Sequence, residues 1–171
     1  MLDGTEISEN LKKNISLAEN YLKKFQGRTM GHFINGEIVD GKSENNFQNI
    51  SPLDLNTINE VNNGSPEDID MAAKAALKAF PAWRNMSGNE RYKILHNIAD
   101  NIVDRAEEIA FIECLDTGQP LRFMSKAALR GAENYRFFAD KAAEAGNGLS
   151  MPAVDHINYS IRQPMGPVGV I

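Results

Sequence analysis

The sequence has a single cysteine, no long apolar run and no cluster of basic residues. One cysteine cannot form an internal disulfide or a cysteine-rich zinc site, and this fits a reducing compartment. No segment approaches the roughly 18 apolar residues of a membrane-spanning helix, and the N-terminus MLDGTEISENLKK is too polar for a signal peptide. A net charge of −5 argues against nucleic-acid binding. We therefore expect a cytoplasmic protein with no membrane or nucleic-acid partner.

Patterns that predict catalysis or metal binding are equally scarce. Gly146-Asn147-Gly148 has no preceding strand and no third glycine, so it does not predict a dinucleotide-binding loop. Cys114 lies in an apolar helical pattern beside the acids Glu113 and Asp116, which raise a thiol pKa, and this favours a structural cysteine over a nucleophile. The three histidines are too far apart for zinc-ligand spacing: His32, His96 and His156.

What the 171 residues do contain is an ordinary globular composition, with 42% hydrophobic and 24% charged residues. The first thirty residues carry an apolar stripe at helical spacing, with Ser8 as the expected N-cap and Gly27 as the expected stop. Such a helix either binds a partner or packs on its own domain. The stripe by itself leaves both interpretations open.

Two pairs of short strands follow. Asn35-Gly36 stands between two short apolar runs, 32–34 and 37–39, and this is a hairpin signal. A second pair is expected at 47–51 and 57–61, joined by a turn at Pro52-Leu53-Asp54.

Helices with recognisable caps come next. Ser65 and Pro66 begin the first of them, and its buried face is expected to contain Ile69, Ala72, Ala73, Ala76, Leu77 and Phe80. Ser87 to Glu90 matches a capping box, and 104–107 repeats the pattern. Gly118 followed by Pro120 predicts a helix end, and a last long helix is expected at about 123–145.

The pattern then returns to period two. Ile157, Tyr159 and Ile161 alternate with polar residues in a strand at 156–163. Residues 167–171, Pro-Val-Gly-Val-Ile, form an apolar strand pattern, which we interpret as the first strand of a parallel sheet whose remainder is missing.

Taken in order, these segments resemble the N-terminal portion of the aldehyde dehydrogenase superfamily. The resemblance spans about residues 32–171 without a large gap. The stretches that carry it are Phe33-Ile34-Asn35-Gly36-Glu37, Asn49-Ile50-Ser51-Pro52, Ala72 to Ala76 with Phe80 and Trp83, Glu90-Arg91, Glu113 to Pro120, Tyr135 to Ala139, and Tyr159 to Ile171. The segment 130–139 further resembles the muconate-semialdehyde branch of the family.

The resemblance implies an α/β fold that contains the N-terminal helical half of a cofactor domain and a β-arm, truncated at the first strand of the parallel sheet. It divides the chain into a helical extension (1–31), the cofactor-domain part (32–148), an oligomerisation β-arm (149–164) and the first sheet strand (165–171). Residues 1–31 lie outside the resemblance. The implied parent is a homo-oligomer, a dimer or a tetramer.

The family oxidises an aldehyde to a carboxylic acid with NAD or NADP, through a cysteine thioester. The nucleophile, the general base and the cofactor-clamping lysine would lie beyond Ile171, so no catalytic residue is expected here. The resemblance places Ile171 beside the cofactor. It also places Arg130 against the far carboxylate of a carboxylated semialdehyde, although a surface pairing with Glu133 or Asn134 competes with that interpretation.

The resemblance also implies a structural sodium or potassium ion. Its expected ligands are the carbonyls of Asn49 and Ile50 and the carboxylate of Asp116. The competing interpretation is that Asp116 only ends its helix. Two hypotheses remain for the whole chain, namely the N-terminal piece of an aldehyde dehydrogenase, inactive alone, or a short non-catalytic module that docks on a full-length relative through the β-arm.

Overall fold

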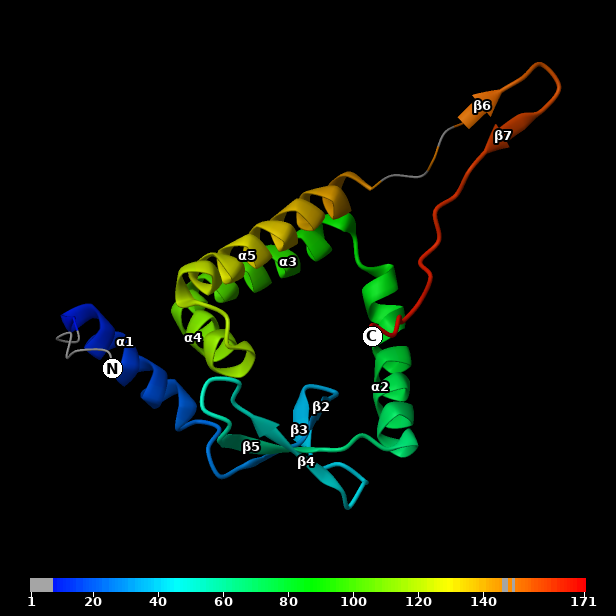
Figure 1. Ribbon diagram of the computed structural model, residues 1–171. Coiled ribbons are helices and arrows are strands. Elements are labelled where there is room, and N and C mark those ends of the chain that lie inside the picture. The colour runs from blue at the N-terminus through cyan, green and yellow to red at the C-terminus, as the bar shows by residue number, and fades with distance from the viewer. Residues whose placement is uncertain (1–7, 146–147, 149) are drawn as a thin grey trace.

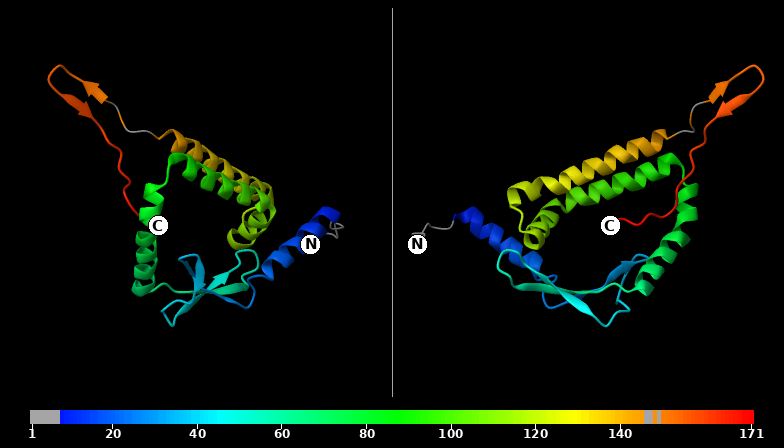
Figure 2. Two further views of the ribbon diagram at one scale, coloured as in Figure 1. Left: turned by 180° about the vertical axis from the view of Figure 1, so that it is seen from behind. Right: turned by 45° about the vertical axis from the view of Figure 1, so that its right-hand side comes forward.

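The fold is described from a computed structural model that covers residues 8–145, 148 and 150–171. A small sheet and five helices are arranged as an open ring of elements (Figure 1). A two-stranded hairpin projects away from this ring. The turned views in Figure 2 show the same projection. None of the described helices is both long and apolar enough to cross a membrane.

The three-stranded sheet contains the predicted strand pair and one further strand that the sequence did not predict. β4 (Asn46–Ile50) pairs antiparallel with β5 (Thr57–Asn62), and β1 (Thr29–Met30) joins β5 in parallel. The hairpin of β2 (His32–Ile34) and β3 (Glu37–Val39) is also confirmed. Asn35 and Gly36 both have positive φ, 56° and 85°, as a tight two-residue hairpin turn requires.

The predicted caps begin the middle helices. α2 (Pro66–Asn85) starts at Ser65 and α3 (Gly88–Asp104) starts at Ser87, each with a reciprocal capping box. The cap expected at 104–107 is wrong: α3 runs on to Asp104, and α4 (Ala106–Thr117) starts at Arg105 without a side-chain cap. The Arg105 side chain instead pairs with Glu108 at 2.8 Å. Gly118 ends α4 in the left-handed conformation, as predicted.

The best-packed part of the chain is where α3, α4 and α5 (Leu121–Glu144) meet, because α3 and α5 lie side by side for most of their length (Figure 1). Alanines at the contact allow the helix axes to approach closely. The buried apolar residues are Ala99, Ala110, Phe111, Met124, Ala128, Ala132 and Ala139.

The apolar face of α2 is not buried, contrary to the expectation from its sequence. Ile69 is 68% exposed and Leu77 is 58% exposed. Pro167, Val168 and Gly169 come against this face, around an apolar cavity. α2 also contacts β2, but the exposure of Ile69 and Leu77 shows that the face expected to be buried has too little partner surface within the described residues.

The N-terminal helix packs on its own domain. α1 (Glu9–Leu22) begins at Ser8, whose hydroxyl accepts a hydrogen bond from the backbone of Leu11. Tyr21 donates to Glu107 at 3.2 Å, and its ring lies 5.8 Å from that of Phe111. Because β1 also belongs to the sheet, the end of segment 1–31 is continuous with the rest of the fold.

An ion-pair cluster joins α1 to α4. Glu108 accepts from Lys24 at 2.7 Å and from Arg105 at 2.8 Å. These hydrogen bonds stabilise the carboxylate and lower the pKa of Glu108 from 4.5 to about 2.

We expect Glu108→Gln to destabilise the chain by about 1 kcal/mol at pH 6, a modest cost because both cationic partners are exposed. A carboxylate with a lowered pKa contributes its full stability above the unfolded pKa, and the contribution is lost as pH falls from about 4.5 to about 2. Urea unfolding at pH 6, 4 and 2 measures this. Glu113→Gln, at an exposed site on the same helix, is the control. A difference between wild type and Glu108→Gln that is equal at pH 6 and pH 2 contradicts the ion-pair account.

The C-terminal segment departs from its expected strands. β6 (Ser150–Pro152) pairs with β7 (Ile157–Tyr159) in an exposed hairpin, so the strand expected at 156–163 is only three residues long. Residues 160–171 form no strand. A strand needs hydrogen-bond partners on a neighbouring strand. Here the carbonyl of Ser160 accepts one bond from the backbone N–H of Gly148 at 3.1 Å, and no backbone hydrogen bond joins residues 161–171 to another described residue.

Candidate functional site

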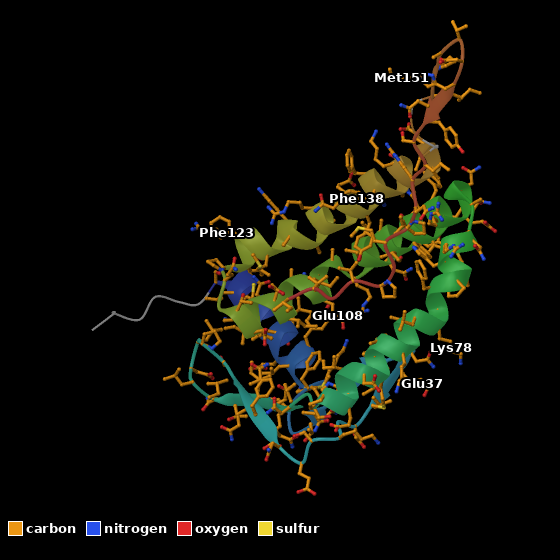
Figure 3. The ribbon with its side chains drawn as sticks, turned by 90° about the vertical axis from the view of Figure 1, so that its right-hand side faces the viewer. Glu37, Lys78, Glu108, Phe123, Phe138 and Met151 are labelled. Carbon is orange, nitrogen blue, oxygen red and sulfur yellow. The ribbon has the colours of Figure 1, made fainter. Side chains whose placement is uncertain are left out.

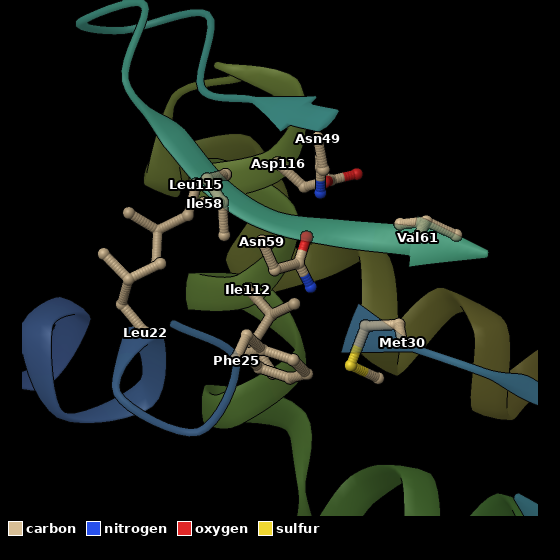
Figure 4. Close-up of a pocket in the computed structure, with 10 residues that line it drawn as sticks. All are labelled: Leu22, Phe25, Met30, Asn49, Ile58, Asn59, Val61, Ile112, Leu115 and Asp116. Atoms are coloured by element: carbon tan, nitrogen blue, oxygen red, sulfur yellow. The ribbon is translucent and has the colours of Figure 1, made fainter. Parts of the chain in front are cut away.

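A pocket of about 280 Å³ lies where α1, the three-stranded sheet and α4 meet (Figure 4). Most of its wall is apolar, and three polar side chains lie at one side. The lining residues are Leu22, Phe25, Met30, Asn49, Ile58, Asn59, Val61, Ile112, Leu115 and Asp116. The pocket is therefore small and mostly apolar, with the side chains of Asn49, Asn59 and Asp116 together at one side.

The polar side is built across the β4–β5 pair. Asn49 and Asn59 are cross-strand partners, so their side chains emerge on the same face of the sheet. The Nδ2 of Asn49 donates to the Oδ1 of Asp116 at 2.8 Å. Asn59 is only 7% exposed, and its Oδ1 has no hydrogen-bond partner among the described residues.

The end of α4 positions Asp116. The left-handed Gly118 stops the helix two residues later with φ 72°, and it does so against Pro52, which follows β4. A Cβ at position 118 would lie 3.0 Å from the Pro52 ring, so a larger residue would separate the helix end from the strand. The helix end predicted from Gly118 and Pro120 thus places the Asp116 carboxylate next to Asn49.

Two of the three residues expected to bind a cation, Asn49 and Asp116, are in side-chain contact. Asp116 contacts Asn49, and the β4–β5 register shifts between Asn49 and Ile50, an irregularity that interrupts regular strand pairing. The same contact shows that Asp116 does more than end its helix. Cation binding itself stays a prediction. The described residues contain no group of three or more His, Cys, Asp or Glu side chains suited to a metal ion.

Arg130 lies on α5, away from this pocket, and its side chain is exposed. It is exposed, as a surface arginine would be, but it forms no ion pair or side-chain hydrogen bond with residues 8–145, 148 or 150–171, so the expected pairing with Glu133 or Asn134 is not observed. Glu133 lies instead 3.9 Å from Arg136, which also donates to Asp100 on α3 at 2.7 Å. The guanidinium of Arg130 is thus left available to a group outside the described residues.

Aromatic side chains share α5 with Arg130. Phe123 and Phe138 lie toward opposite ends of this helix (Figure 3), and both are more than half exposed. Phe138 packs edge-on against Phe137 at 5.3 Å between ring centroids. α5 therefore presents apolar rings together with the exposed cations Lys126 and Arg130, which form no ion pair with the described residues.

Cys114 has the character of a structural residue. It is half-buried in α4, and burial raises the pKa of its thiol, with the charge of Glu113 adding to the shift. A raised pKa keeps a thiol protonated near neutral pH, and the protonated thiol is a poor nucleophile. The predicted direction of the pKa shift is confirmed.

Ile171 is fully exposed. Its expected contact with a cofactor therefore stays a prediction. Sequence reasoning missed Asn59. The signal that could have found it is its register opposite Asn49, and that register becomes known only once the strands are paired.

Comparison with known proteins identifies the family. The model of the aldehyde dehydrogenase family matches residues 38–171. A 2-hydroxymuconic semialdehyde dehydrogenase from Pseudomonas sp. (strain CF600) is 38% identical over 146 residues, which cover 82% of this chain and 30% of that protein.

Solved structures agree with this assignment. HpcC from Thermus thermophilus superposes with a TM-score of 0.83 at 33% identity, over 88% of this chain and 30% of that one. The betaine aldehyde dehydrogenase from Staphylococcus aureus, solved in complex with NAD+, gives 0.72 at 27% identity, over 80% of this chain and 27% of that one.

The chain belongs to the aldehyde dehydrogenase family. It spans about 30% of the length of the relatives that it matches. The resemblance and the α/β fold class expected from the sequence are both confirmed.

Proposed function

We propose that these residues form the N-terminal part of an NAD(P)-dependent aldehyde dehydrogenase that oxidises an aldehyde to a carboxylic acid through a cysteine thioester. The observation that carries the proposal is the superposition on HpcC over 88% of this chain. The resemblance assigns the general base and the nucleophile to residues outside this chain. The one cysteine present, Cys114, is half-buried with a raised pKa and is a poor nucleophile. We place the protein in the cytoplasm, in keeping with its free thiol.

The proposed substrate is a carboxylated semialdehyde. Two observations support it: the similarity to a 2-hydroxymuconic semialdehyde dehydrogenase and the guanidinium of Arg130, which pairs with no described side chain. A guanidinium remains charged at all accessible pH values and binds a carboxylate through two parallel hydrogen bonds. The neighbouring rings of Phe137 and Phe138 add apolar surface to the same helix.

The proposed cofactor is NAD or NADP, but the residues of this chain do not fit a complete dinucleotide site. Ile171 has an exposed side chain, and residues 161–171 form no backbone hydrogen bond with another described residue. We therefore assign Ile171 one contact at most. When bound, the nicotinamide accepts the hydride from the substrate.

We also propose a sodium or potassium site, for which the residues of this chain are better suited than for a dinucleotide. A carboxylate and backbone carbonyls are the oxygen ligands that hard cations prefer. The side-chain contact between Asn49 and Asp116, next to the irregular register at Ile50, supports the proposal. Potassium-dependent protection against unfolding, measured for wild type and Asp116→Asn, tests the site, and equal protection of both proteins would argue against it.

The experiment that tests the proposed function is to sequence the coding region downstream of Ile171. In the family that the sequence resembles, the 167–171 segment is followed almost at once by a Pro-Trp-Asn motif, whose asparagine helps to hold the oxyanion. An open frame that continues with Pro-Trp-Asn therefore supports an aldehyde dehydrogenase. A native stop codon immediately after Ile171 supports the second candidate, a non-catalytic module that docks on a full-length relative. The observation that favours the module is the β6–β7 hairpin, whose edges have no neighbour among the described strands.

We expect the isolated chain to self-associate, as a dimer, a tetramer or a larger species. In the hairpin, Ile157 is 71% exposed and Met151 is 67% exposed, and the edge of β7 can pair with another chain. Light scattering across a tenfold concentration range measures the mass. A variant with Ile157→Lys and Met151→Lys should shift the distribution toward monomer. A monodisperse monomer of the wild-type chain at high concentration contradicts the expectation.

A further inference from the structure

Each of the three histidines lies beside an aspartate, and burial separates one of these pairs from the other two. The Nε2 of His32 is 3.6 Å from the Oδ2 of Asp68, whose side chain is 3% exposed. The pairs with exposed aspartates, at 61% and 85%, are His96–Asp140 at 3.4 Å and His156–Asp155 at 2.7 Å. Water and salt screen exposed charges more than buried ones, so the longest of the three contacts is also the least screened.

Asp68 contacts the β2–β3 hairpin at both of its open ends. His32 is the first residue of β2, and beyond β3 the backbone N–H of Lys42 donates to both carboxylate oxygens of Asp68 at 3.1 Å. The same carboxylate accepts from the backbone N–H and the hydroxyl of Ser65, at 2.9 and 2.8 Å. One buried side chain thus joins the base of the hairpin to the N-cap of α2.

The contact with His32 is the one part of this arrangement that makes no hydrogen bond. Its Nε2 is buried without a hydrogen-bond partner among the described residues, because 3.6 Å is too long for one. Gly41 packs so closely that a Cβ at this position would lie 2.9 Å from the same nitrogen. A neutral imidazole carries one N–H and one lone pair, whereas an imidazolium carries an N–H at both nitrogens. The protonated ring therefore always directs a charged donor at Asp68.

The carboxylate keeps its charge over the range in which a histidine changes its own. Hydrogen bonding from the backbone N–H of Ser65 is the main reason that the pKa of Asp68 lies below 3.8, and the charge of His32 adds to the shift. Such a carboxylate contributes its stability above its unfolded pKa and loses it as pH falls below that value. Histidines gain their charge between about pH 8 and pH 5. Both charges are therefore present together at mildly acidic pH.

No other charged side chain of the described residues forms an ion pair with His32. Lys42, the nearest basic residue along the loop after β3, contributes its backbone N–H to Asp68, and its side chain is exposed. The interaction between the hairpin and α2 at this point thus depends on the charge of one imidazole.

We propose that His32 and Asp68 form a proton-controlled clamp that holds the β2–β3 hairpin to the start of α2. Protonation of the imidazole closes the clamp, and loss of that proton loosens the hairpin. Phe33 and Ile38 are cross-strand partners in the hairpin and are 74% and 69% exposed, so the clamp controls how firmly this exposed apolar pair is held. The clamp is independent of the proposed aldehyde chemistry.

A double-mutant cycle in the 171-residue chain tests the clamp. His32→Gln, Asp68→Asn and the double variant are unfolded in urea at pH 5.5 and pH 8.5. Asparagine at position 68 keeps an acceptor for the donors of Ser65 but removes the charge. At pH 5.5 we expect the two substitutions to be coupled by about fivefold in the unfolding equilibrium constant, and at pH 8.5 we expect the coupling to vanish because the imidazole is neutral. No coupling at pH 5.5, or equal coupling at both pH values, overturns the proposal.

His96 and Asp140 form the matched control pair, because they join α3 to α5 through a carboxylate that is 61% exposed. The same cycle with His96→Gln and Asp140→Asn is expected to give little coupling at either pH. High salt should remove the coupling that remains there and leave most of the coupling between His32 and Asp68, since buried pairs are screened less. Equal loss of coupling in both pairs would show that His32 makes an ordinary surface contact, and the proposal would fail.

Hydrogen exchange locates the effect in the hairpin and decides the question even if Asp68→Asn does not fold. We expect the protection of the amides of residues 33–38, corrected for the intrinsic pH dependence of exchange, to fall several-fold from pH 5.5 to pH 8.5 in the wild-type chain. In His32→Gln the same amides should show no such dependence. The amides of α3 and α5 are the internal reference and should keep their protection. Hairpin protection that is independent of pH in the wild type, or equally dependent in His32→Gln, contradicts the clamp.

Discussion

No reduction of NAD is expected when the purified 171-residue chain is mixed with NAD or NADP and an aldehyde. The proposed chemistry needs a thiolate, and the loss of the nucleophile from a covalent mechanism costs many orders of magnitude in rate. Cys114 does not replace it. Burial and the charge of Glu113 raise the pKa of its thiol, and it lies in α4 within the helical layer.

Absorbance at 340 nm, followed with a muconate-type semialdehyde and with a neutral aldehyde, measures the activity. The matched control is Cys114→Ala, which tests whether any residual signal depends on this thiol. NAD reduction by the wild-type chain that disappears in Cys114→Ala would overturn the assignment of the nucleophile to residues outside this chain. A signal equal in both proteins would indicate a contaminating enzyme.

Local signals in the sequence account for much of the observed fold. Asn35-Gly36 specifies a turn that few other dipeptides can adopt, because both residues have positive φ. Ser65 and Ser87 begin their helices for a reason contained within four residues, the reciprocal pairing of hydroxyl and carboxylate with free backbone donors. Such features need no tertiary partner and can therefore be predicted from the sequence.

Features that depend on distant partners could not be read in this way. The apolar period of α2 correctly predicts a helix and one apolar face, but its exposure depends on what packs against it, and the described residues place little there. The strand expected at 167–171 fails to form for the same reason, since a strand is defined by its neighbour. The cap expected at 104–107 does not form. The helix starts at Arg105, and the Arg105 side chain pairs with Glu108.

In the candidate site, too, some residues could be predicted from the sequence and others depend on distant partners. Asn49, Ile50 and Asp116 came from the resemblance, and the structure brings Asn49 and Asp116 into contact across 67 positions of sequence. Asn59 could not be found, because its significance rests on two non-local facts, its register opposite Asn49 and the absence of a donor for its Oδ1 among the described residues. In the sequence alone, Asn59 is not distinguished from the other polar residues of its short strand.

Replacing Arg130 by alanine in a full-length enzyme that contains this chain is expected to raise KM for a carboxylated semialdehyde by about 10 to 100-fold. The reason is the loss of a charge-assisted, two-point contact with the far carboxylate of the substrate. In this structure Arg130 is exposed and pairs with no described side chain, so its removal breaks no ion pair of the fold. Kinetics with a neutral aldehyde should be nearly unchanged.

A matched variant separates binding from a general effect of charge. Arg122 lies on the same helix, two turns earlier, and its guanidinium is 4.7 Å from the ring of Phe123. Arg122→Ala removes the same charge from α5, and we expect it to leave both substrates nearly unaffected. Arg130→Lys should recover part of the affinity, because an ammonium keeps the charge but loses the planar fork of donors. An equal rise in KM for the charged and the neutral aldehyde in Arg130→Ala would show that Arg130 acts on the structure of α5 and not on the substrate carboxylate.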